Sequence, residues 1–190
     1  MSYEISSKNF KDVLDKAGIS YSTEHVSDQN KECRDVFNDQ DLREISQFGY
    51  VGDVSIKWPV EQFYIYPLAN LLKMQEGYRV SNGIADTHWD QAKYVIGDWA
   101  ADPVSIDKSG GIWYAVHGEG EWNYDKLSNS LEEFIDTLRK WVEYFLIENK
   151  GKIKNEQRKI TLEKKAEVQE IVLGSLNEEC KKGFMRFLFS

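Results

Sequence analysis

The residues of this chain that could do chemistry gather between positions 85 and 125. That segment holds eight acidic residues and two lysines, and it contains Trp89, Trp99, Trp113 and Trp122. Interleaved carboxylates and indoles have two interpretations. In one, the rings fill the core of a sheet and the carboxylates are solvated at its rim. In the other, turn-flanked rings such as Trp99 and Trp122 join the acids in a surface for a basic partner.

The three histidines of the chain give no support for nucleophilic catalysis. His25 and His88 fall in predicted loops, and His117 falls at the end of a predicted strand. No GxSxG motif occurs, and Ser-His-Asp or Cys-His combinations can be assembled from any chain of this size. The glycine clusters at 110–111 and 118–120 match neither GxGxxG nor the Walker motif. We therefore predict that the protein is not an enzyme.

Metal and cofactor binding have equally little support. Asp98, Asp102 and Asp107 are spaced four and five residues apart, but the alternation of an EF-hand loop and its closing glutamate are missing. Cys33 and Cys180 belong to no CxxC pair and have no histidine at metal-ligand spacing. The sequence predicts two reduced thiols, no metal site and no cofactor. A hydrolase using Asp98 and Asp102 with a metal is an alternative whose activity a chelator would abolish.

Charge is distributed unevenly along the chain. The net charge is −8, but residues 1–149 hold fourteen Lys and Arg against twenty-six Asp and Glu, whereas residues 150–190 hold ten against six. The first part therefore carries −12 and the tail +4. An acidic body repels phosphate backbones, which excludes direct nucleic-acid binding by the main domain and favours a basic protein partner.

Periodicity and turn signals predict the elements that would position these side chains. Helical patterns cover residues 7–17, 41–48, 67–76, 130–145, 155–173 and 175–189. Strand patterns cover residues 51–58, 63–66, 93–96, 103–107 and 111–117. Residues 108–111 join the last two strands as a hairpin. Asp41, Ser130 and Ser175 are the predicted helix caps, each followed three residues later by a glutamate.

Several short motifs follow one another between about residues 50 and 140. They are Tyr66-Pro67-Leu68, Glu76-Gly77-Tyr78, Tyr94-Val95-Ile96-Gly97-Asp98, Asp102-Pro103-Val104-Ser105-Ile106-Asp107, Ile112-Trp113-Tyr114-Ala115-Val116-His117 and Ser130-Leu131-Glu132-Glu133-Phe134-Ile135. In this order they resemble the SUKH superfamily, the SMI/KNR-like proteins that include many bacterial immunity proteins. Members often carry glycines where this chain has Trp99-Ala100-Ala101. The resemblance implies an α+β fold, with a twisted, mostly antiparallel β-sheet flanked by helices, and a role in neutralising a cognate toxin.

Length and composition are consistent with that organisation. A chain of 190 residues that is 41% hydrophobic can form one well-packed domain. We expect the SUKH-like α+β domain to span 1–149, and a basic helical C-terminal extension to span 150–190. No run of 18 apolar residues and no leader pattern occurs, so we expect a cytoplasmic protein that does not contact the membrane.

Charge and resemblance together predict the contact surface. We expect the partner-binding residues to be Asp98, Trp99, Asp102, Glu119, Glu121 and Trp122, in loops beside the sheet. The expected partner is a basic protein, namely a cognate toxin such as a nuclease, whose basic groove an acidic protein can occupy. A regulatory or scaffolding adaptor of the same fold, binding a cellular protein, is the alternative. The sequence specifies no oligomeric state.

Overall fold

The computed structural model describes residues 2–28 and 30–189 of the chain. Five α-helices occur in the described residues, and they are α1 (Tyr3–Ala17), α2 (Asp39–Phe48), α3 (Leu131–Val142), α4 (Leu162–Ile171) and α5 (Glu178–Phe189). Shorter 3-10 turns lie at Lys31–Asp35, Leu68–Asn70 and Lys73–Gln75, and α3 continues as a π-helical segment over Glu143–Glu148.

A six-stranded antiparallel sheet forms the centre of the molecule. In spatial order it consists of β10 (Tyr124–Ser128), β9 (Ile112–Ala115), β8 (Asp102–Asp107), β7 (Lys93–Trp99), β4 (Gln62–Ile65) and β3 (Val54–Lys57). Two small antiparallel pairs lie outside it, namely β1 (Ser22–Glu24) with β2 (Tyr50–Gly52), and β5 (Val80–Ser81) with β6 (Ile84–Ala85). The α+β class and the mostly antiparallel sheet expected from the sequence are confirmed.

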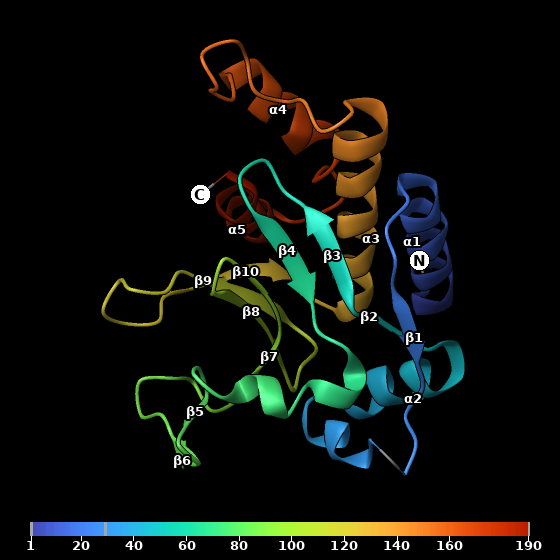
Figure 1. The fold of residues 1–190 in the computed structure, drawn as a ribbon, viewed down its shortest axis with the longest axis vertical. Helices are drawn as coiled ribbons and strands as arrows, with labels where there is room; N and C mark the ends of the chain where they lie inside the picture. The colour runs from blue at the N-terminus through green and yellow to red at the C-terminus, as the bar shows by residue number, and fades with distance from the viewer. Residues whose placement is uncertain (1, 29, 190) are drawn as a thin grey trace.

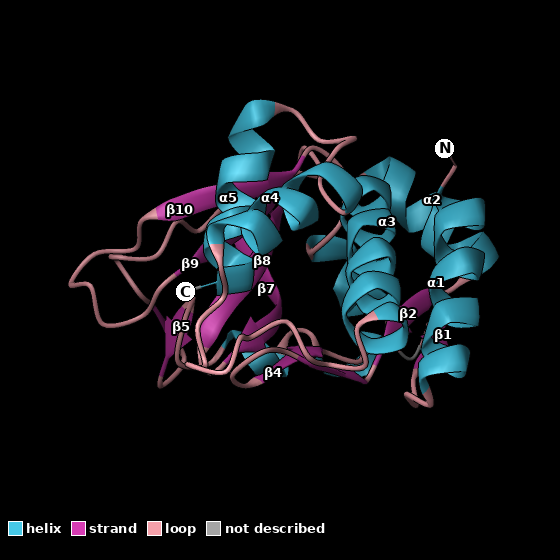
Figure 2. Cartoon of the chain, turned by 90° about the horizontal axis from the view of Figure 1, so that it is seen from above, coloured by secondary structure: helices cyan, strands magenta, loops and turns pink. Residues whose placement is uncertain are grey.

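Helices cover one face of this sheet. α3 and α1 lie side by side beyond β3 in Figure 1, and the view from above shows α5 against the curved sheet with α3 next to it (Figure 2). Phe63 on β4 explains the packing, because its ring contacts Phe134 of α3 at 6.3 Å and Phe187 of α5 at 5.1 Å between centroids. A large part of the hydrophobic core therefore lies between the sheet and these two helices.

The C-terminal helix belongs to this core. Phe187 is fully buried, and its ring lies 5.1 Å from Trp58 and 5.0 Å from Tyr114. The Trp58 indole also donates a hydrogen bond of 3.3 Å to the Phe187 carbonyl. Gly183 makes the approach possible, because a Cβ there would meet the Lys126 carbonyl oxygen at 2.1 Å. α5 thus packs on the sheet, while α4 lies at the top of Figure 1, farther from it.

Local signals predicted several elements well. Ser130 caps α3 by accepting a hydrogen bond from the Glu133 amide, as the capping motif indicated. The turn after β8 is also as expected, with Asp107 accepting hydrogen bonds from the backbone of Ser109 and Gly111. The Asp107 carboxylate thereby accepts hydrogen bonds from backbone N–H groups that have no backbone acceptor in a four-residue loop.

Other expectations were wrong. Asn38 rather than Asp41 caps α2, and the Asn177 side chain rather than Ser175 accepts the amide hydrogen bond from Cys180 at the start of α5. The segment after Pro67 forms two 3-10 turns instead of an α-helix. The tail helix expected over 155–173 begins only at Leu162, and β10 was not foreseen.

No helix among the described residues has both the length and the apolar character that crossing a membrane requires.

Candidate protein-binding surface

The turn between β7 and β8 carries unusual backbone strain. Ala100 and Ala101 have φ angles of 53° and 71°, although left-handed conformations disfavour residues with a Cβ. Such positive φ values at both central residues of a two-residue hairpin are normally taken by glycine or asparagine. Asp98 supports the turn, because its Oδ1 accepts a hydrogen bond of 3.3 Å from the Ala101 amide. The Tyr78 hydroxyl donates to the Ala101 carbonyl at 3.2 Å.

Asp98 is held on the face of the sheet opposite α3 and α5. It pairs in register with Tyr64 of β4, and the Tyr66 hydroxyl donates to its Oδ2 at 2.7 Å. Burial and the nearby Asp98 carboxylate raise the pKa of Tyr78 to about 12, and burial followed by the Asp98 hydrogen bond raises the pKa of Tyr66 well above its ordinary value. Asp98 is therefore a structural acceptor within a group of tyrosines.

Asp102 lies on the other face of the sheet. It pairs in register with Trp99, which itself pairs with Phe63 on the helix-covered face. The Asp102 side chain is nearly buried and accepts a hydrogen bond of 2.9 Å from the Tyr114 hydroxyl. Since Asp98 pairs with Tyr64 instead, the two carboxylates point to opposite faces and do not form one site.

Asp102 also fixes the start of the loop between β9 and β10. Its Oδ1 accepts a hydrogen bond of 2.8 Å from the His117 amide and lies 2.6 Å from His117 Nδ1. The His117 side chain is 57% exposed, so one edge of the imidazole contacts solvent. The carboxylate therefore ties the strained turn to the loop and orients the His117 ring.

That loop, residues 116–123, holds the remaining acidic candidates and Trp122. It projects away from the sheet in Figure 1. Glu119 forms a 2.9 Å ion pair with Arg186 of α5, which also pairs with Asp125 of β10 at 2.7 Å. Glu121 is exposed and forms no ion pair or hydrogen bond with any described residue. Of the two glutamates in this loop, only Glu121 thus presents a carboxylate without a partner among the described residues.

Trp122 is anchored by other aromatic rings. Its ring lies 5.1 Å from Trp89 and 6.1 Å from Tyr78, and Trp89 in turn contacts Tyr124 at 5.6 Å. Trp89 is buried, whereas Trp122 is half-buried and keeps part of its indole accessible. The cluster pre-orders the exposed side of Trp122 at little further entropic cost, as rigid aromatic contact residues require.

A shallow hollow of about 220 Å³ opens beside Glu121 and Trp122. Val116, Gly118, Gly120, Glu121 and Trp122 line it. The two glycines have φ angles of 81° and 87°, a conformation that glycine adopts without steric cost. The hollow combines an indole wall with an unpaired carboxylate at its edge.

Trp99 does not belong to this surface. Its side chain is only 7% exposed and faces the helix-covered side of the sheet, where it lines a different cavity together with residues of the C-terminal segment. The indole N–H is buried and has no hydrogen-bond acceptor among the described residues. The structure therefore separates Trp99 from Trp122, although the sequence suggested equivalent roles for them.

The six residues expected from the sequence thus divide into three groups. Asp98 and Asp102 hold the turn and the loop, Trp99 faces another cavity, and Glu119, Glu121 and Trp122 lie together in the loop. Sequence reasoning missed the supporting aromatic cluster of Tyr78, Trp89 and Tyr124. The aromatic residues spaced along 78–124 were a signal for this cluster. Their contacts join separate strands and loops, so the sequence did not show that the rings meet.

Comparison of the chain with family models, with curated proteins and with solved structures found no match. In the described part of the chain, no group of three or more His, Cys, Asp or Glu side chains is arranged to hold a metal ion.

Proposed function

We propose that the protein binds a basic protein partner through the hollow formed by loop 116–123. One observation carries this proposal, namely the unpaired Glu121 carboxylate next to the partly exposed and pre-ordered Trp122 ring. A lysine or arginine placed over the indole face gains a cation–π interaction and can pair with the carboxylate at the same time. Aromatic anchors of this kind dominate the affinity of protein interfaces.

The charge of the surrounding chain supports the same proposal. Residues 1–149 carry −12, which attracts a basic partner over distances of about a Debye length, near 10 Å at moderate salt. Such a field accelerates encounter more than it slows dissociation. A basic active-site groove, such as that of a nuclease toxin, would offer the complementary surface.

The resemblance to the SUKH superfamily makes the partner a cognate toxin that this protein neutralises inside the cell that makes it. A regulatory or scaffolding adaptor is the alternative within the same fold. The two differ in a measurable way, because co-expression with the partner rescues growth only if that partner is a toxin. The position of the gene directly after a toxin gene would favour the first function.

We propose binding without turnover. The alternative of a metal-dependent hydrolase required Asp98 and Asp102 to act together, and their carboxylates point to opposite faces of the sheet. The exposed His117 ring beside Asp102 is the remaining arrangement with the form of a general base. Hydrolysis of nucleotides, peptides or sugars that survives repurification and is lost in His117→Gln would contradict this part of the proposal.

The binding experiment uses a partner captured from native lysate and then purified. Association and dissociation are measured by surface plasmon resonance for the parent protein, Trp122→Ala and Glu121→Lys. Glu121 is the position for charge reversal because it is exposed, whereas Asp102 is nearly buried and a lysine there would disrupt folding. Equal kinetics for the parent and both variants, with folding confirmed by circular dichroism, would place the interface elsewhere.

A further inference from the structure

A second cavity, suited to a small ligand, lies beside the C-terminal segment. A cavity of about 360 Å³ is formed between the β3–β4 turn, the end of β7, the segment before α4, and α4 and α5. Its apolar wall includes Trp58, Val60, Trp99 and Phe189. Trp58 is fully buried, whereas Val60 is 64% exposed at the rim. An exposed aliphatic side chain beside buried indoles gives the cavity an apolar interior that opens to solvent.

Four cationic side chains line the same cavity. They are Lys154, Arg158, Lys159 and Lys165. None of them forms an ion pair with a described residue, although other lysines of the same region do, such as Lys164 with Glu167 at 2.8 Å. Lys165 Nζ lies 5.4 Å from the centre of the Phe189 ring. The cavity therefore concentrates positive charge that the described chain does not neutralise.

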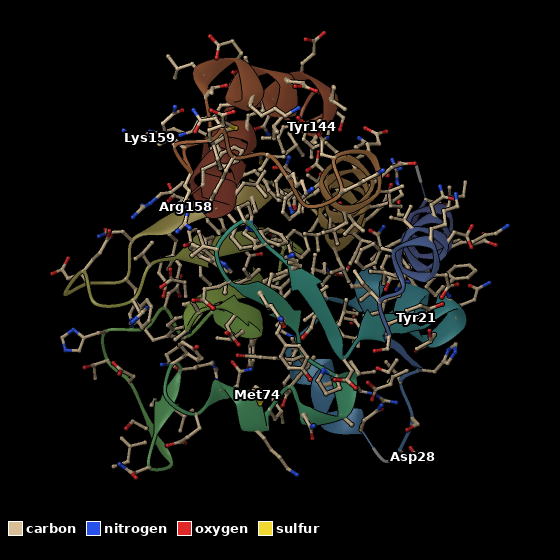
Figure 3. The ribbon with its side chains drawn as sticks, turned by 45° about the horizontal axis from the view of Figure 1, so that its top comes forward. Tyr21, Asp28, Met74, Tyr144, Arg158 and Lys159 are labelled. Atoms are coloured by element: carbon tan, nitrogen blue, oxygen red, sulfur yellow. The ribbon has the colours of Figure 1, made fainter. Side chains whose placement is uncertain are left out.

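The backbone before α4 is built to present these cations. The Asn155 amide donates to the Lys159 carbonyl at 2.8 Å, and the Lys159 amide donates to Asn155 Oδ1 at 2.9 Å. Between them Arg158 has a φ angle of 60°, a strained value for an arginine. Figure 3 shows Arg158 and Lys159 one above the other on the same side of the molecule, beside α5. The closed turn thus holds two adjacent cations at the cavity.

We propose that this cavity binds a small organic anion whose body is aromatic or aliphatic. The unpaired cations would take the carboxylate or phosphate group, and the indoles with Val60 and Phe189 would enclose the apolar body. A basic protein partner is repelled here, so the site is distinct from loop 116–123 and does not depend on the function proposed for that loop. The volume is at the small end of the range of about 300–1,000 Å³ typical of ligand sites.

The test uses three probes with the same ring system and different head groups. They are 1-naphthoate, 1-naphthyl phosphate and the neutral 1-naphthalenemethanol. Binding to the full chain is followed by ¹H–¹⁵N NMR, in which the indole N–H signals of Trp58 and Trp99 report the cavity directly. We expect saturable shifts of these two signals with at least one anion at concentrations below about 1 mM, and much weaker binding of the alcohol. The two anions distinguish a carboxylate site from a phosphate site.

Exposed positions supply variants that leave the core intact. The double variant Arg158→Gln/Lys159→Gln removes two cavity cations, and we expect it to weaken binding of the preferred anion by about three- to tenfold. The control Lys152→Gln/Lys182→Gln removes the same charge at two exposed lysines outside the cavity. We expect the control to change the affinity by less than about twofold.

Three results would overturn the proposal. The first is the absence of saturable shifts at the Trp58 and Trp99 indoles with both anions. The second is equal affinity for the anions and the alcohol, which would show an apolar cavity without anion recognition. The third is equal weakening by the two double variants, which would show attraction to net charge alone. None of these results bears on partner binding by Trp122 and Glu121, so the two proposals fail separately.

Discussion

Loop 116–123 and the cavity beside the C-terminal segment are opposite in charge, and helix α5 packs against both. The loop presents the Glu121 carboxylate next to Trp122, whereas the cavity presents four cations around Trp58 and Trp99. α5 contributes to both, because its Arg186 pairs with Glu119 of the loop while its Phe189 lines the cavity. The tail of the chain therefore completes both surfaces.

The difference shows how far a charge count along the chain can mislead. Trp99 lies in the middle of the acidic segment 85–125, yet its ring shares a cavity with Lys154, Arg158 and Lys159. Strand alternation is the cause, since Asp98 and Trp99 are neighbours in sequence and lie on opposite faces. The face of the sheet on which a side chain lies decides which charged residues surround it, and its neighbours in the sequence do not.

The largest expected effect tests the packing of helix α5. Phe187→Ala removes a fully buried ring that contacts Trp58, Phe63 and Tyr114, and we expect it to lower the free energy of unfolding by about 3–5 kcal/mol. Chemical denaturation measures the change. Because α5 holds both surfaces, the partner and 1-naphthoate should both bind less well to this variant in native buffer.

Phe134→Ala is the matched variant. Its ring is buried between Phe63 and Phe184, and its truncation should also lower the free energy of unfolding by about 3–5 kcal/mol. Phe134 lies in α3 and lines neither surface, so the folded protein should retain both binding activities. A loss below about 1 kcal/mol in either variant would mean that the ring is not part of the core.

The second expected effect separates the two surfaces. Trp122→Ala should weaken binding of the basic partner by about 2 kcal/mol or more, chiefly through faster dissociation, because it removes the aromatic anchor. The affinity for 1-naphthoate should be unchanged, since the Trp122 ring packs on Trp89 and Tyr78 away from the cavity. Parallel loss of both affinities would show that the loop and the cavity are one site or that the variant is misfolded.

A third, smaller effect tests the strain in the turn between β7 and β8. Ala100→Gly should raise the free energy of unfolding by about 1 kcal/mol, because glycine adopts the φ of 53° without a Cβ clash. Thermal and urea denaturation measure it. Ala115→Gly is the contrasting change, since Ala115 is buried in β9 and glycine there should destabilise the strand. Destabilisation by Ala100→Gly would show that the turn does not carry the strain inferred from its backbone.

The smallest effect concerns rim charge. Glu121→Lys should slow association with the basic partner by a few-fold, about 0.5–1 kcal/mol, and reduce its salt dependence, with a smaller effect on dissociation than Trp122→Ala has. Glu4→Lys, an exposed change in α1, controls for the altered net charge. If Glu4→Lys has the same kinetic effect, the overall field rather than the loop governs encounter.

The sequence by itself determined the local features of this protein. The apolar stripe from Leu131 to Phe145 and its Ser130 cap specified α3, and Asp107 with its glycines specified the hairpin after β8. These signals act within a few residues, through periodicity and side-chain hydrogen bonds to the nearby backbone. The α+β class followed from the same information.

Only the tertiary structure decided which faces the functional candidates occupy. Asp98, Trp99 and Asp102 lie within five positions, yet register places the two carboxylates on opposite sides and Trp99 beside lysines more than fifty residues away. Arg186 pairs with Glu119, and the Tyr78 and Trp89 rings order Trp122. Such contacts depend on strand register and helix docking, which the whole core sets through burial and not through local pattern.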